Sequence, residues 1–109
     1  TTTTAQGVDC AQGYTTQNGL PITSIDSYTE GTIPASASNA YECCEACVSE
    51  AGCAYSIFND GTCNIALIGS GCNVDTVAGV FYTSNVGEPV GVINNGPCGY
   101  LTFAGNNDN

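Results

Sequence analysis

The stretch that decides the fold runs from residue 39 to 67 and reads NAYECCEACVSEAGCAYSIFNDGTCNIAL. Its first half predicts a helix over residues 39–51. Asn39 is a favourable N-cap, and Glu42 follows three residues later, as in a capping box. Gly52 is a typical residue for ending a helix. We therefore expect one well-capped helix near the centre of the chain.

The cysteines of this helix point in two directions. Cys43 and Cys47 lie one turn apart and share a face, whereas Cys44 lies about 100° round the helix from Cys43. Cys44 must therefore form its bond in another direction.

The second half of the stretch predicts a β-hairpin. Residues 53–58 and 62–68 have the composition of strands, and the Asp60-Gly61 pair between them is a strong signal for a hairpin turn. Elsewhere in the chain, strands are predicted at residues 10–14, 79–83, 90–93 and 100–103.

The segment from residue 15 to 38 is rich in turn residues. We expect its apolar side chains to reach the core from loops or short strands. These side chains are Ile22, Ile25, Tyr28 and Ile33.

The charge of the chain is entirely acidic. It has no lysine, arginine or histidine but ten acidic residues, which gives a formal net charge of -10. No side chain can neutralise a phosphate, so nucleic acid is excluded as a partner, and the acidic balance also argues against binding to anionic membranes. Catalysis by a Ser–His or Cys–His pair or by a lysine Schiff base is excluded because histidine and lysine are absent.

The cysteine content indicates an oxidising compartment. Eight cysteines in 109 residues are typical of a single secreted domain held by disulfides, and neither histidine nor paired zinc knuckles are present. No apolar run is long enough to span a membrane, and the chain begins without methionine, so we expect a mature chain. We expect a polar tail at 1–7, one domain at 8–104 and a second tail at 105–109, in a protein that is secreted or associated with a cell wall.

The deciding stretch resembles the PAN/apple module, in which a helix with cysteines one turn apart precedes a short hairpin. The matching residues are Cys43, Cys47, Gly52-Cys53, Gly61-Thr62-Cys63 and Leu67. The later segment, with Cys72 and the Asn95-Gly96-Pro97-Cys98-Gly99 turn, is similar to small PAN-like proteins secreted by fungi. The resemblance implies an α+β fold with one helix packed on a curved antiparallel sheet. The chain departs from the family in having no basic residue, so it cannot bind acidic partners through a basic patch.

The resemblance also implies a set of disulfides. It pairs the helix cysteines with the hairpin that follows, as Cys43–Cys63 and Cys47–Cys53. For the remaining four we expect Cys10–Cys98 and Cys44–Cys72. Eight cysteines allow on the order of a hundred pairings, and the sequence alone does not choose among them.

The acidic residues offer two chemical possibilities. A glycosidase uses a pair of carboxylates, and the candidates here are Asp26, Glu30, Asp60, Asp75 and Glu88. We favour solvated loop acids over this alternative, and so predict no catalytic residues and no enzyme. Oxygen-rich loops make Asp60 and Asp75 weak calcium candidates, but they lack the spacing of an EF-hand, and we predict no metal or other cofactor.

The aromatic residues divide into core and surface candidates. Tyr55, Phe58, Phe81 and Phe103 lie in predicted strands and are expected in the core. Tyrosine is frequent at interfaces. The candidate interface residues are Tyr14, Tyr28, Tyr82 and Tyr100, together with Thr1, Thr2, Thr3 and Thr4 of the N-terminal tail.

Two functions remain open from the sequence. The first is a non-catalytic structural protein of an extracellular surface that assembles with copies of itself into a filament or coat, its Thr-rich tail adding a strand to a neighbour's sheet. The second is a monomeric recognition module for glycans or proteins.

Overall fold

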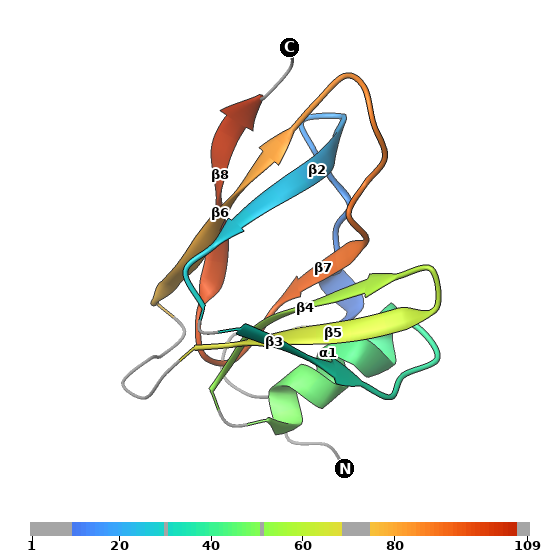
Figure 1. Cartoon of the computed structure of the whole chain (residues 1–109), viewed down its shortest axis with the longest axis vertical. Coiled ribbons are helices and arrows are strands. Elements are labelled where there is room, and N and C mark those ends of the chain that lie inside the picture. Colours follow the sequence, from blue (N-terminus) through green and yellow to red (C-terminus); the bar gives the residue numbers. More distant parts are fainter. Residues whose placement is uncertain (1–9, 30, 51, 69–74, 107–109) are drawn as a thin grey trace.

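The computed structural model describes residues 10–29, 31–50, 52–68 and 75–106. They form two four-stranded β-sheets and one α-helix (Figure 1). The first sheet has the order β1-β2-β6-β8, with β1 (Thr16–Gln17), β2 (Leu20–Ser27), β6 (Val77–Thr83) and β8 (Tyr100–Asn106). The second has the order β3-β5-β4-β7, with β3 (Gly31–Ala35), β5 (Thr62–Leu67), β4 (Cys53–Asn59) and β7 (Val92–Asn95).

The single helix α1 (Ala40–Ser49) packs on β4 and β5, on the side of the second sheet that faces away from the first (Figure 1). A short 3-10 helix, η1 (Cys10–Gln12), contacts α1. The structure therefore confirms a small α+β domain with one helix.

The expectation of one antiparallel sheet is wrong, because there are two sheets and β8 pairs with β6 in parallel. The reason lies in the path of the chain. After β6 the chain returns through β7, which belongs to the second sheet, to the end of the molecule where β6 begins (Figure 1). β8 starts there and therefore runs in the same direction as β6.

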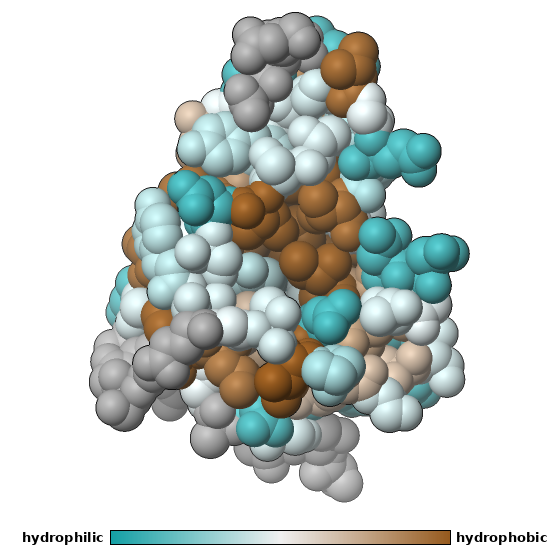
Figure 2. All heavy atoms as spheres, in the orientation of Figure 1, coloured by the Kyte–Doolittle hydropathy of each residue, from teal (hydrophilic) through white to brown (hydrophobic). Residues whose placement is uncertain are grey.

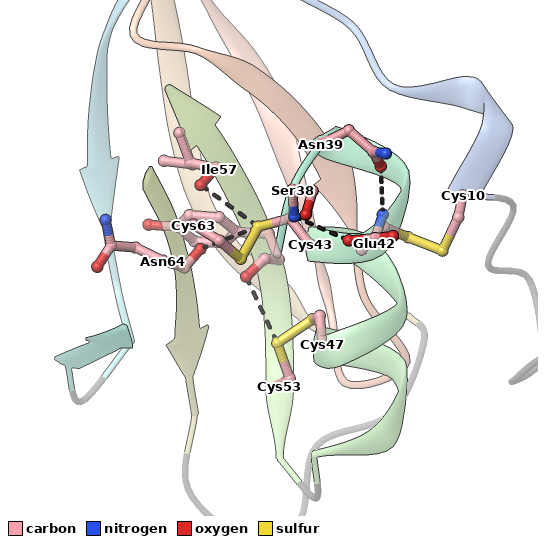
Figure 3. Close-up of a disulfide and its surroundings, with 12 residues drawn as sticks. Cys10, Ser38, Asn39, Glu42, Cys43, Cys47, Cys53, Ile57, Cys63 and Asn64 are labelled. Carbon is pink, nitrogen blue, oxygen red and sulfur yellow. Dashed lines mark hydrogen bonds between the residues drawn. A yellow bond between two sulfur atoms is a disulfide. The ribbon is translucent and has the colours of Figure 1, made fainter. Parts of the chain in front are cut away.

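The expected signals at the start of α1 are confirmed. The Asn39 side chain accepts a hydrogen bond from the Glu42 backbone N–H at 2.9 Å (Figure 3). The Glu42 carboxylate accepts one from the Ser38 N–H at 2.8 Å, one residue earlier than in the usual capping box. Two donors at the start of the helix are satisfied in this way without tertiary contacts.

The hairpin is also confirmed, with β4 and β5 joined by a turn at Asp60 and Gly61. Both turn residues have positive φ, 53° and 79°, as a two-residue hairpin of this twist requires. A register shift between Cys53 and Tyr55 indicates a bulge at Ala54. It allows Cys53 to pack under the helix while Tyr55 packs between the sheets.

Three expectations outside the deciding stretch are corrected. Residues 10–14 are no strand: η1 occupies 10–12, and Tyr14 forms an isolated bridge with Ile93. The short strands expected as one possibility in segment 15–38 are present as β1 and β3, beside the longer β2, and Ile22 and Ile25 reach the core as expected. Tyr28 and Ile33 do not, because they are 57% and 39% exposed. Gly105 and Asn106, expected in a tail, end β8. The N-terminal tail 1–7 and residues 107–109 lie outside the described residues.

Two of the expected disulfides are present. Cys43–Cys63 joins α1 to β5, and Cys47–Cys53 joins α1 to the start of β4 (Figure 3). All four cysteines are buried and, with Ile65, form a core between the helix and the second sheet.

The other two expected pairings are wrong, because Cys10 bonds to Cys44. Cys44 lies about 100° round the helix from Cys43 and so faces η1 and not the sheet. Cys98 is disulfide-bonded as well. Cys72, the remaining cysteine of the eight, lies outside the described residues.

A second core lies between the two sheets. Ile22, Phe81 and Leu101 of the first sheet pack with Tyr55 and Ile93 of the second. Figure 2 shows hydrophobic residues gathered in the middle of one face, over the space between the sheets. The expected core position is confirmed for Tyr55 and Phe81. It is wrong for Phe103, which is 39% exposed, and Phe58 is half-buried.

The first prediction concerns Gly96, which packs on the Cys47–Cys53 bridge. A Cβ on Gly96 would lie 2.6 Å from both Cys47 Sγ and Cys53 O. The Gly96→Ala substitution should lower the free energy of unfolding by about 1–3 kcal/mol, because the bridge and the strand cannot both move away. Denaturant unfolding measures this, and an unchanged midpoint would contradict the close packing.

The second prediction concerns the corrected disulfide. Cys10–Cys44 has a sequence separation of 34 and Cys47–Cys53 one of 6. Loop-closure entropy then predicts a loss of about 4 kcal/mol for the Cys10→Ser/Cys44→Ser double variant and about 2 kcal/mol for Cys47→Ser/Cys53→Ser. The pairing is checked by mass spectrometry of non-reduced peptides, and a peptide linking Cys10 to Cys98 would refute it.

Candidate functional site

A hollow of about 320 Å³ lies where one face of the first sheet meets the end of β7. Segments distant in the sequence line it: the residues before and in β1, one residue of β6, the last residue of β7 and two of β8. They are Tyr14, Thr16, Gln17, Phe81, Asn95, Leu101 and Phe103.

Three aromatic rings in contact form one wall of the hollow. The centroids of Tyr14 and Phe81 are 5.8 Å apart, and those of Phe81 and Phe103 are 5.6 Å apart, with tilts of 49° and 39°. Phe81 and Phe103 are register partners in the parallel β6–β8 pair. Phe81 contacts both of the other rings and is only 4% exposed. Phe103 is 39% exposed, so part of its ring surface is accessible.

Asn95 connects the aromatic wall to the strands around it. Its Oδ1 accepts hydrogen bonds from the Leu101 backbone N–H at 3.2 Å and from the Tyr14 hydroxyl at 3.4 Å. One amide oxygen thus links β7, β8 and the segment before β1.

Tyr14 is held by its backbone as well as its side chain. Its N–H and C=O both bond to Ile93 at 2.9 Å. Burial raises the pKa of the Tyr14 hydroxyl to about 12. The hydroxyl is therefore a neutral donor to Asn95 at any physiological pH.

The hollow is uncharged in a strongly acidic protein. None of its lining residues is ionised at neutral pH. They come from three stretches of the sequence that contain no acid, 10–25, 76–87 and 89–107. The hollow can therefore take a neutral ligand without placing it against a carboxylate.

The structure places the interface candidates in different surroundings. Tyr14 lines the hollow, whereas Tyr28 is 57% exposed away from it. Tyr82 and Tyr100 are half-buried and are not among the lining residues. Thr1 to Thr4 lie outside the described residues.

Of the residues that line the hollow, the sequence analysis proposed only Tyr14 as an interface residue. Asn95 was interpretable only as a turn residue, and Phe103 as core. The available signal was the alternation in β8, which puts Leu101 and Phe103 on the same face. Nothing in the sequence showed that β1 would face them.

The candidate acids are scattered over the surface. Asp26, Asp60, Asp75 and Glu88 are all exposed and come from β2, the hairpin turn and two loops; Glu30 lies outside the described residues. Among the residues that the structure describes, no group of three or more potential metal ligands comes together. Nor does this part of the chain contain a helix long and apolar enough to cross a membrane.

Comparison with protein-family models, curated protein sequences and solved structures found no match to this chain.

The third prediction follows from the raised pKa of Tyr14. In the unfolded chain a tyrosine loses its proton near pH 10, whereas folded Tyr14 keeps it until about pH 12. The contribution of Tyr14 to the free energy of unfolding is therefore fully present below about pH 10 and is lost as the pH rises from about 10 to about 12. Tyr14→Phe should flatten the decline in unfolding free energy above about pH 10, measured by denaturant titration. A decline of the same slope in the variant would contradict this origin.

Proposed function

We propose that this chain is a non-catalytic extracellular recognition module that binds an uncharged saccharide in the hollow. The row of three rings in an uncharged hollow carries the proposal. Ligand sites combine apolar and aromatic walls with a few placed polar groups, and this hollow has that composition.

The aromatic wall suits the faces of sugar rings. A sugar face presents C–H groups, which pack on the negative face of an aromatic ring, while its rim presents hydroxyls. Phe103 supplies exposed ring surface, and Gln17, Asn95 and Thr16 supply amide and hydroxyl groups beside it. The net charge of -10 on the protein repels anionic sugars and so disfavours their binding at this wall.

The disulfides support an extracellular location, since such bridges persist in oxidising compartments. Two of them, Cys43–Cys63 and Cys47–Cys53, also support the PAN/apple-like assignment, which implied them. That assignment, a fungal source and a place at the cell wall belong to this proposal.

The alternative of self-assembly stays a prediction. It depends on tails at residues 1–7 and 105–109, and the described residues include only Gly105 and Asn106 of these.

The fourth prediction tests the binding function. Titration of the labelled protein with neutral oligosaccharides, followed by amide NMR, should shift Leu101 and Phe103, and an anionic oligogalacturonate should not. Phe103→Ala should weaken binding at least tenfold, which is about 1.4 kcal/mol. The matched control is Tyr28→Ala, which removes an exposed ring outside the hollow and should leave affinity unchanged.

The proposal fails when no member of the panel shifts the hollow residues. It also fails when Phe103→Ala and Tyr28→Ala bind equally well.

A further inference from the structure

We propose that Asn95 determines the specificity of the hollow by presenting a hydrogen-bond donor, and that it selects an acetamido sugar. This inference rests on the proposed binding function and names the class of saccharide.

The orientation of the Asn95 amide follows from its partners. The Leu101 backbone N–H can only donate, so the atom that faces it at 3.2 Å must be the oxygen, Oδ1. The Tyr14 hydroxyl, which remains protonated, donates to the same oxygen. Both acceptor positions of Oδ1 are therefore used within the protein.

Nδ2 is what remains for a ligand. It forms no hydrogen bond to any residue that the structure describes. Nδ2 carries two N–H groups and no acceptor, so Asn95 can only donate to a molecule in the hollow.

The Asn95 donor is held in place before any ligand arrives. Asn95 pairs with Tyr55 at the end of β7, and the next residue, Gly96, donates its N–H to Ala54 O at 2.7 Å. A polar group fixed in this way costs little ordering entropy on binding.

A donor of this kind discriminates between ligand groups. A ligand hydroxyl both donates and accepts, so it can pair with either a donor or an acceptor on the protein. A ligand carbonyl only accepts and a ligand ammonium only donates, so a protein donor pairs with the carbonyl and not with the ammonium. A neutral sugar carries such a carbonyl when it is acetylated on oxygen or on nitrogen, and the amide carbonyl of an acetamido group is the stronger acceptor of the two. The methyl of the same group can pack on Leu101 and Phe103, which line the hollow beside Asn95.

Asn95→Asp isolates this property. The aspartate has nearly the same shape, and its carboxylate accepts from Leu101 N–H and Tyr14 OH as the amide does. The substitution replaces the donor that the protein leaves unused at Asn95 by a charged acceptor. It should therefore lower the preference of the hollow for an acetylated over an amino sugar while leaving the aromatic wall intact.

The experiment compares three trimers of equal length by calorimetry and amide NMR: N-acetylglucosamine, glucose and glucosamine. The natural protein should bind the N-acetylglucosamine trimer more tightly than the glucose trimer. The glucosamine trimer is cationic and is attracted by the net charge of -10, so only the change in its affinity between variants is used. In Asn95→Asp the ratio of the affinities for the acetylated and the amino trimer should fall at least tenfold. Asn59→Asp, which adds the same charge at an exposed position outside the hollow, is the matched control and should change the ratio far less.

The outcomes separate the two proposals. If no neutral saccharide of either panel shifts the hollow residues, the binding function itself is wrong. If other neutral sugars bind there but the acetylated trimer does not, or binds no more tightly than the glucose trimer, the acetamido specificity is wrong. An equal change of the ratio in Asn95→Asp and Asn59→Asp would refute the role of Asn95.

Discussion

The attachment of α1 to the β4–β5 hairpin by two buried disulfides is the constraint on which the rest of the structure depends. The chain has no basic side chain, so no ion pair between side chains can form, and its acids repel one another. Cys43–Cys63 and Cys47–Cys53 fix the helix on one face of the second sheet regardless of this repulsion. The opposite face is then free to pack against the first sheet through Tyr55 and Ile93.

The deciding stretch could be predicted from sequence because its signals are local. The capping pair Asn39 and Glu42 and the Asp60-Gly61 turn act within a few residues of themselves. The hairpin bridges followed from a resemblance. Cys10–Cys44 did not, because it requires knowing that η1 lies beside the helix.

β2 could not be predicted because a bulge hides its pattern. Ile22 and Ile25 are three residues apart, a spacing that puts side chains on opposite faces of a regular strand. The register shift between Ile22 and Ser24 brings both against the same core. The hollow escaped prediction for a related reason: its walls come from segments about 80 residues apart, and only the pairing of strands in space brings Tyr14 to Asn95.

The sequence separation of the paired strands also sets an order of events during folding. α1 and the hairpin can form early, since their contacts are local. The pairings of β2 with β6 and of β4 with β7 span far more of the chain, since Ile22 and Thr83 are 61 residues apart (83 − 22) and Tyr55 and Asn95 are 40 apart (95 − 55). They carry a higher loop-closure cost and are expected to form later. Because Leu101 and Phe103 belong to β8, the hollow is complete only once the whole chain has folded. Nascent or partly bridged chains that lack these long-range pairings would then lack the hollow, and with it the proposed binding site.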